Sequence, residues 1–140
     1  MRQILYTTTL KKNSFDAFLP PISDGYARFG KKVSPVKIIW DTGSTNTSIS
    51  YWTAYDLEVH GNGTEIEVGH VGGNSKEQLC TVVIYVNDNG FHFGSDMIVT
   101  IRPKEDKTRN VLLGMDVISQ FNFLLRHDND KIVFEFYTEV

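Results

Sequence analysis

Asp41 is the residue of this sequence whose surroundings best suit acid–base chemistry. It follows the β-favouring apolar run 36–40, and a carboxylate at the end of a buried strand is unfavourable unless hydrogen-bond donors lie close by. Residues 42–45, Thr-Gly-Ser-Thr, supply hydroxyl groups and unhindered backbone N–H groups. A carboxylate held by such donors can be tuned to act as a general acid or a general base.

Short strands are expected to position this residue. Apolar alternation and β-branched runs predict strands at residues 3–10, 26–29, 33–40, 45–51, 64–68, 79–86, 91–101, 111–113, 123–126 and 131–137. Ser50 is expected to cap a short helix over 51–57, and residues 115–121 have helical spacing. Asp24-Gly25 and Asp88-Asn89-Gly90 predict turns. About nine or ten short strands with one or two short helices indicate an all-β, barrel-like fold.

Composition narrows the class of protein. The chain of 140 residues suits one domain spanning 1–140, and its formal net charge of -3 argues against a nucleic-acid partner. The lone cysteine, Cys80, excludes an internal disulfide and fits a reducing compartment. No apolar run reaches the roughly 18 residues that span a bilayer, and the N-terminus is too polar for a signal peptide. We therefore expect a soluble, cytoplasmic protein with no membrane partner.

The histidines do not indicate a metal site. All four are scattered along the chain without the spacing that metal ligands require: His60, His70, His92 and His127. We therefore expect no metal and no cofactor.

Three features follow one another in a fixed order along the chain. The apolar strand leads into Asp41-Thr42-Gly43-Ser44, a glycine-containing tip follows around 71–73, and Val111-Leu112-Leu113-Gly114 precedes a helix near the C-terminus. This order resembles the retropepsin-like aspartic proteases, the single-lobe relatives of the pepsins, over residues 33–136. The resemblance implies a closed, barrel-like acid-protease fold, with 1–32 as an N-terminal strand and hairpin extension and 33–136 as the core.

The resemblance also implies roles for individual residues. Asp41 would be the catalytic aspartate, with Gly43 bringing its N–H close to the carboxylate. Thr42 would hydrogen-bond across a dimer axis to the partner's backbone, and Ser44 would hydrogen-bond the outer carboxylate oxygen. The substrate would lie between a flap and the strand behind the active-site loop, formed by Val71, Gly72, Gly73 and Asn74 and by Leu112, Leu113 and Gly114. One departure is Trp40, which is bulkier than the small aliphatic residue usual before the aspartate.

Peptide hydrolysis without a covalent intermediate needs a general base to activate water and a general acid to protonate the substrate. Two carboxylates about 3 Å apart serve both roles because they share one proton. The sequence has one Asp-Thr-Gly, and the strongest other candidate, Asp116, is interpreted as a helix-capping residue. The second carboxylate is therefore expected from Asp41 of another copy. The result would be a two-fold homodimer in which the terminal strands 4–8 and 132–137 interleave.

Two other functions remain open from the sequence. The same dimeric fold could hold a peptide without cleaving it, or serve as an assembly module. Residues 41–47 also resemble the phosphate-binding hairpin of actin-like and sugar-kinase ATPases, although that fold needs several hundred residues and a second phosphate motif. The sequence thus predicts a homodimeric aspartic endopeptidase that acts on peptides or proteins, with these two alternatives.

Overall fold

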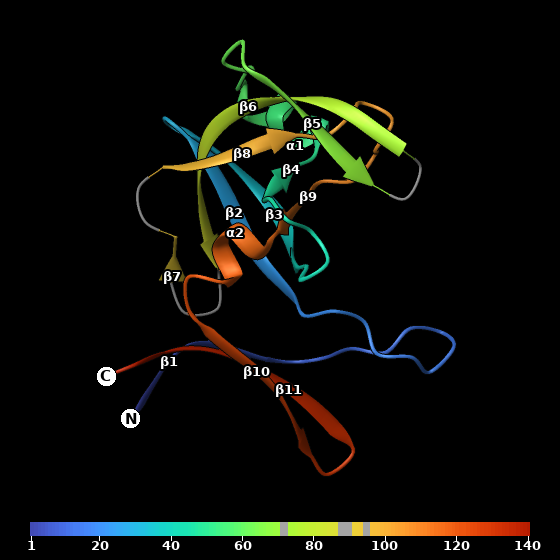
Figure 1. Cartoon of the computed structure of the whole chain (residues 1–140), viewed down its shortest axis with the longest axis vertical. Coiled ribbons are helices and arrows are strands. Elements are labelled where there is room, and N and C mark those ends of the chain that lie inside the picture. Colours follow the sequence, from blue (N-terminus) through green and yellow to red (C-terminus); the bar gives the residue numbers. More distant parts are fainter. Residues whose placement is uncertain (71–72, 87–90, 94–95) are drawn as a thin grey trace.

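Six strands close into a barrel, which forms the upper part of Figure 1. The computed structural model describes residues 1–70, 73–86, 91–93 and 96–140. Around the barrel, the strands follow in the order β2 (Ile22–Phe29), β3 (Lys32–Trp40), β9 (Asn110–Leu113), β4 (Ser48–Ile49), β8 (Met97–Ile101) and β6 (Gly73–Val86). Pairing of β2 with β6 closes the ring. This closed, mostly β structure with two short helices confirms the fold class predicted from the sequence.

A long hairpin extends from the barrel. It consists of β5 (Glu65–His70) and the first part of β6, which pair antiparallel from Glu65 opposite Gln78 to His70 opposite Gly73 (Figure 1). The other end of β6 pairs with β7 (Phe91–His92). The two-stranded arm that the sequence predicts on either side of residues 70–76 is therefore present.

A three-stranded antiparallel sheet lies below the barrel in Figure 1. Its strands are, in spatial order, β1 (Arg2–Thr9), β11 (Lys131–Glu139) and β10 (Asn122–Asp128). Because β11 lies between β1 and β10, both of its edges are already paired within the chain. The outer edges of β1 and β10 have no strand beside them among the described residues, so the interleaving of the terminal strands with a second copy stays a prediction.

Trp40 joins this sheet to the barrel. It is the last residue of β3 and is only 1% exposed. Its ring stacks on Tyr6 of β1 at 5.5 Å and lies 5.1 Å and 4.8 Å from the rings of Phe134 and Phe136 on β11. Its indole N–H donates to the Ser23 hydroxyl at 2.8 Å, so the one polar atom of this large buried side chain is satisfied.

Two short helices complete the structure. Helix α1 (Tyr51–Leu57) begins after Ser50, whose hydroxyl accepts a hydrogen bond of 3.2 Å from Thr53 N–H, as predicted from the sequence. Helix α2 (Met115–Ile118) ends sooner than the predicted 115–121, because the chain turns after it into β10. Neither helix, nor any other part of the described chain, offers a helical segment long and apolar enough to cross a membrane.

The turn predicted at Asp24-Gly25 is wrong, because both residues lie within β2. A Cβ atom at Gly25 would clash with the Tyr85 carbonyl of β6 and with the Ile38 side chain of β3. Glycine is therefore needed where β2 closes the barrel against β6, and not for a turn. The reversal itself comes at Gly30, whose φ of 59° is readily adopted by glycine. The strand predicted over 45–51 is likewise reduced to Ser48–Ile49.

Candidate active site

Asp41 follows directly after β3, where β3 runs parallel to β9. Trp40 is paired with Leu113, and the Asp41 N–H donates a hydrogen bond of 2.8 Å to the Leu113 carbonyl. Leu112 is half-buried and Leu113 is buried. The strand β9 therefore lies behind the Asp41 loop, in the position that the resemblance implies for residues 112–114.

The Asp41 loop holds one carboxylate oxygen with the backbone. The Gly43 N–H donates a hydrogen bond of 2.9 Å to Asp41 Oδ1. A Cβ atom at position 43 would lie 3.2 Å from this oxygen, so glycine permits the close approach. Ser44 N–H donates to the Asp41 carbonyl at 3.2 Å and closes the turn. The Asp41 side chain stays half-buried, so its carboxylate is both positioned and accessible.

Ser44 makes a different hydrogen bond from the one that the resemblance implies. Its hydroxyl donates to the Asn46 carbonyl at 2.8 Å and not to the Asp41 carboxylate, because the loop folds back and brings that carbonyl within reach. Thr42 is exposed, and its hydroxyl has no hydrogen bond within the part of the chain that the structure describes. Its bond across a dimer axis therefore stays a prediction.

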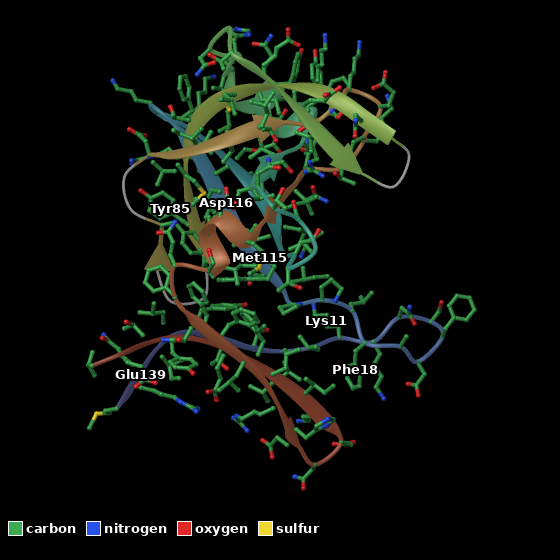
Figure 2. All side chains as sticks on the ribbon, viewed as in Figure 1. Lys11, Phe18, Tyr85, Met115, Asp116 and Glu139 are labelled. Carbon is green, nitrogen blue, oxygen red and sulfur yellow. The ribbon has the colours of Figure 1, made fainter. Side chains whose placement is uncertain are left out.

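A network that the sequence did not reveal ties the Asp41 loop to α2. Asp116, labelled in Figure 2, accepts hydrogen bonds from the Thr47 hydroxyl at 2.8 Å and from Thr47 N–H at 3.0 Å. The Thr47 oxygen in turn accepts from Gly114 N–H at 3.1 Å, and Thr47 is fully buried. Met115 N–H adds a 2.8 Å bond to the Ser44 carbonyl. Asp116 also accepts a hydrogen bond of 2.9 Å from Val117 N–H in the first turn of α2, which confirms its predicted place at the start of the helix, although the N-cap position itself is Gly114. The same carboxylate therefore serves the helix start and joins α2 to the Asp41 loop.

Gly114 lies against the same loop. A Cβ atom there would lie only 2.6 Å from the Asn46 carbonyl carbon and oxygen, so no larger residue fits without moving the loop. The glycine at this position therefore serves close backbone packing between β9, α2 and the Asp41 loop.

Gly73 and Asn74, two of the residues predicted to form a flap, lie at the start of β6 in the β5–β6 hairpin. Gly73 opens β6 with a φ of 121°, a conformation that favours glycine, and Asn74 pairs with Gly69 of β5. Val71 and Gly72 lie outside the described residues. The hairpin is thus present, and its role as a flap over the substrate stays a prediction.

An apolar groove opens beside Asp41. It has a volume of about 350 Å³, and Asp41 is the one charged group among its described lining residues. The apolar lining includes Leu10, Phe18, Pro21, Ile118, Leu125 and Phe134, and Thr42 adds a hydroxyl. No second carboxylate of the described chain lines this groove, so the single chain presents one carboxylate there.

A larger cavity lies elsewhere, beside α1 and the loop after β8. It has a volume of about 910 Å³ and its lining does not include Asp41. Arg102 in its wall is held by Asp106 at 2.8 Å, and burial lowers the pKa of this guanidinium. We place the candidate active site at Asp41 in spite of the smaller volume, because its half-buried carboxylate lies at the end of a barrel strand and is held by a backbone N–H of its own loop.

Within 1–70, 73–86, 91–93 and 96–140, no three His, Cys, Asp or Glu side chains gather as metal ligands. Cys80 is buried, and burial raises the pKa of its thiol to about 11, which keeps the sulfur protonated and unreactive.

Comparison with known proteins assigns the fold. The sequence matches no protein-family model and no curated protein sequence. The structure is similar to a retropepsin-like aspartic protease from Rickettsia conorii, with a TM-score of 0.54 and 14% identity over 99% of this chain and 97% of that one. It is also similar to EIAV protease complexed with the inhibitor HBY-793, with a TM-score of 0.50 and 21% identity over 73% of this chain and 88% of that one. The chain has the retropepsin-like aspartic protease fold.

Proposed function

We propose that this chain is an aspartic endopeptidase that works as a homodimer. The observation that carries the proposal is the Asp41 loop itself: an accessible carboxylate at the end of a barrel strand, with one oxygen held by Gly43 N–H. The two similar structures are a retropepsin-like aspartic protease and EIAV protease, which supports the same chemistry in a chain of this fold. The ATPase-like alternative gains no support from this fold.

The proposed reaction needs two Asp41 carboxylates facing each other across a two-fold axis. Like charges so close share one proton, so one carboxylate is ionised and the other protonated. The ionised carboxylate takes a proton from a bound water, whose oxygen attacks the peptide carbonyl carbon, while the protonated carboxylic acid gives its proton to the carbonyl oxygen. The carboxylic acid formed in the first step then protonates the amine nitrogen as the C–N bond breaks, while the other carboxylate takes the proton from one hydroxyl of the intermediate. The products are a carboxylic acid and an amine, and the pair again holds one proton.

The neighbouring residues receive supporting roles in this proposal. Gly43 N–H stabilises the ionised carboxylate, because hydrogen bonds to the charged form favour it. Thr42 is exposed beside Asp41 and would bond the partner's loop, and Ser44 would support the loop through Asn46. The flap residues 71–74 and the strand residues 112–114 would enclose the substrate chain, and a peptide or protein would be the substrate.

Replacement of Asp41 tests the proposal. Asp41→Asn keeps the shape of the side chain and removes its acid–base function, so peptide cleavage should fall by at least 100-fold, the lower range for lost general acid–base catalysis. The measurement is mass spectrometry of a diverse peptide mixture incubated at mildly acidic pH with wild-type or variant protein.

Asp24→Asn is the matched control, because Asp24 lies on β2 and its partner is the Lys37 ammonium. This variant should cleave like wild type. Cleavage that survives Asp41→Asn would exclude the assignment. A wild-type dimer that binds peptides without cleaving them would instead establish the non-catalytic binding module.

A further inference from the structure

The large cavity beside α1 takes no part in the proposed reaction. Its volume of about 910 Å³ lies near the upper end of the roughly 300–1,000 Å³ of typical ligand pockets. Its walls come from α1, the segment 58–61, strand β6, the end of β8 and the loop after β8. It shares none of its described lining residues with the groove beside Asp41, so a ligand here would lie outside the candidate active site.

The acidic side chains of this cavity already have partners. The Asp56 carboxylate accepts a hydrogen bond of 2.7 Å from Arg109 Nε, and the Glu58 carboxylate lies 3.6 Å from Lys32 Nζ. Neither of these two cations lines the cavity. Both carboxylates are therefore neutralised from outside it.

Two lysines of the cavity lack such partners. Lys76 on β6 and Lys104 on the loop after β8 line it from different elements, and neither makes an ion pair within the described chain. Glu67 lies opposite Lys76 in the β5–β6 register but does not line the cavity. The third cation, Arg102, is paired with Asp106 at 2.8 Å. The charge left without a partner in the cavity is therefore positive.

Hydrogen-bond donors also remain free in this cavity. The backbone N–H groups of His60 and Gly61 donate to no acceptor within the described chain. By contrast, the Gln78 side-chain oxygen already accepts from Gly63 N–H at 3.3 Å. A ligand that fits the cavity must therefore bring acceptors, and preferably negative charge.

One wall of the cavity is apolar and aromatic. Tyr51 and Tyr55 lie one turn apart on α1, and Tyr55 is 64% exposed. The ring of Trp52 packs against both, at 5.1 and 5.5 Å between centroids. Ile101 and Val59 add aliphatic surface. Aromatic side chains that are already packed in place can anchor a bound segment, because little ordering is needed when it binds.

We propose that the cavity beside α1 binds an acidic peptide segment. Lys76 and Lys104 would pair with its carboxylates, the free backbone N–H groups would donate to its carbonyls, and its apolar side chains would pack on the α1 tyrosines. The role of this segment rests on the proposed function, because the segment would belong to the protein substrate, outside the stretch that is cleaved. The second contact would keep the cleaved stretch near Asp41 and so raise the affinity for the whole substrate.

A capped hexapeptide, Glu-Leu-Glu-Glu-Leu-Glu, is the probe for binding, and the same peptide with Gln in place of Glu is its control. Binding is measured by isothermal titration calorimetry with Asp41→Asn protein, so that the peptide stays intact. The acidic peptide should bind at least about tenfold more tightly than the glutamine peptide. Its affinity should fall as salt is raised, because salt screens the ionic contacts.

Paired lysine variants test whether the cavity supplies these contacts. Lys76→Gln with Lys104→Gln should weaken binding of the acidic peptide at least about tenfold. Lys11→Gln with Lys131→Gln is the matched control, because both lysines are exposed, lie outside the cavity and remove the same charge. Lys11 is labelled in Figure 2. This control should bind like its parent, and circular dichroism checks that each variant keeps its fold. Equal weakening by both pairs would overturn the proposal, because the overall charge would then explain the binding.

Photo-cross-linking tests where the peptide binds. The acidic peptide is made with a photoreactive leucine analogue, irradiated with Asp41→Asn protein and mapped by mass spectrometry after digestion. Labels should fall within 51–61, 76–78 or 101–104, the segments that form the cavity. Labels confined to the groove beside Asp41 would overturn the proposal.

Cleavage kinetics test the role of the segment. Wild-type protein is given two substrates that share one cleavable stretch and carry either the acidic or the glutamine hexapeptide as a tail. The acidic tail should lower KM and leave kcat unchanged, because it adds binding without altering the chemistry. This difference should disappear in the Lys76→Gln, Lys104→Gln variant.

The outcomes separate this inference from the proposed function. An acidic peptide that does not bind, or binds no better than the glutamine peptide, would overturn the inference. Cleavage that depends on Asp41 but shows no preference for the acidic tail would leave the protease standing and exclude the role of the cavity. Binding that depends on Lys76 and Lys104 and maps to the cavity would establish the site even if the wild-type chain cleaved no peptide, and only the proposed function would then fail.

Discussion

Asp41 lies between two positions that require side chains of opposite size. Trp40 before it must be large, because its ring fills the junction between β3 and the aromatic side chains of β1 and β11. Gly43 after it must be small, because its N–H reaches the carboxylate. Trp40 departs from the small residue usual at this position in the resembling family, and the three-stranded sheet packed against it accounts for the difference.

Cys80 allows a prediction at the same scale. Burial raises the pKa of its thiol from 9.0 to about 11, so the folded chain keeps a proton that the unfolded chain loses first. The stabilisation that the buried, protonated Cys80 thiol gives to the folded chain is therefore fully present below pH 9 and is lost as the pH rises toward 11. The difference in unfolding free energy between wild type and Cys80→Ala, measured with urea, should shrink over this range. A constant difference between pH 7 and pH 11 would contradict the expectation.

At the scale of elements, the Asp41 loop and α2 behave as one unit. Thr47 carries the connection, since its buried hydroxyl donates to Asp116 and accepts from Gly114 N–H. Two further backbone bonds run from α2 to the loop, from Met115 to Ser44 and from Asp116 to Thr45. The loop that carries the candidate catalytic residue is therefore held by a helix more than seventy positions later in the chain.

Thr47→Val tests this connection. The substitution keeps the shape of the side chain and removes the hydroxyl, so Gly114 N–H loses its acceptor and the Asp116 carboxylate loses one of its donors. Leaving a buried donor unsatisfied costs about 1–3 kcal/mol, so the free energy of unfolding in urea should fall by about that amount. Thr45→Val is the matched control in the same loop, because the Thr45 side chain is exposed and should change stability by under about 0.5 kcal/mol. Equal effects of the two substitutions would contradict the role given to Thr47.

Elements with local signals could be predicted, and those set by distant contacts could not. The Ser50 cap and α1 were predicted correctly, since cap and helix are adjacent in sequence. The role of Gly25 was missed, because the backbone that requires a glycine there belongs to β6, which is distant in the sequence. Thr47 was missed for the same cause: its partners lie 67 and 69 residues away, and nothing in the local pattern distinguishes it from neighbouring polar residues. The Asp41 loop was found because strand, carboxylate and glycine are contiguous.

At the scale of the whole molecule, the fold consists of a closed barrel and a separate three-stranded sheet that carries both ends of the chain. Asp41 and its groove lie where the two parts meet, since Trp40 and Phe134 contribute to the groove wall. One copy presents one carboxylate there among its described residues, so the chemistry proposed above requires assembly. The catalytic unit is expected to be larger than the folding unit.

Mixing experiments test this expectation. If the site is shared between two chains, inactive Asp41→Asn chains should lower the activity of wild-type chains, because each mixed dimer has only one Asp41. At equal amounts and free exchange, about a quarter of the dimers contain two wild-type chains, so activity per wild-type chain should fall to about half. Peptide cleavage is measured after the mixture has equilibrated. In the control mixture with Asp24→Asn chains, which should cleave like wild type, activity per total chain should stay unchanged. If activity per wild-type chain does not change when the Asp41→Asn variant is added, the active site is complete in one chain.

The packing of Trp40 also has an optical consequence. The chain contains two indoles, and the one in Trp40 lies among aromatic rings at the junction of barrel and sheet, one residue before Asp41. The emission of an indole moves to longer wavelength when water reaches it. The native fluorescence spectrum therefore contains a reporter of whether barrel and sheet stay together at the candidate active site, with no label added.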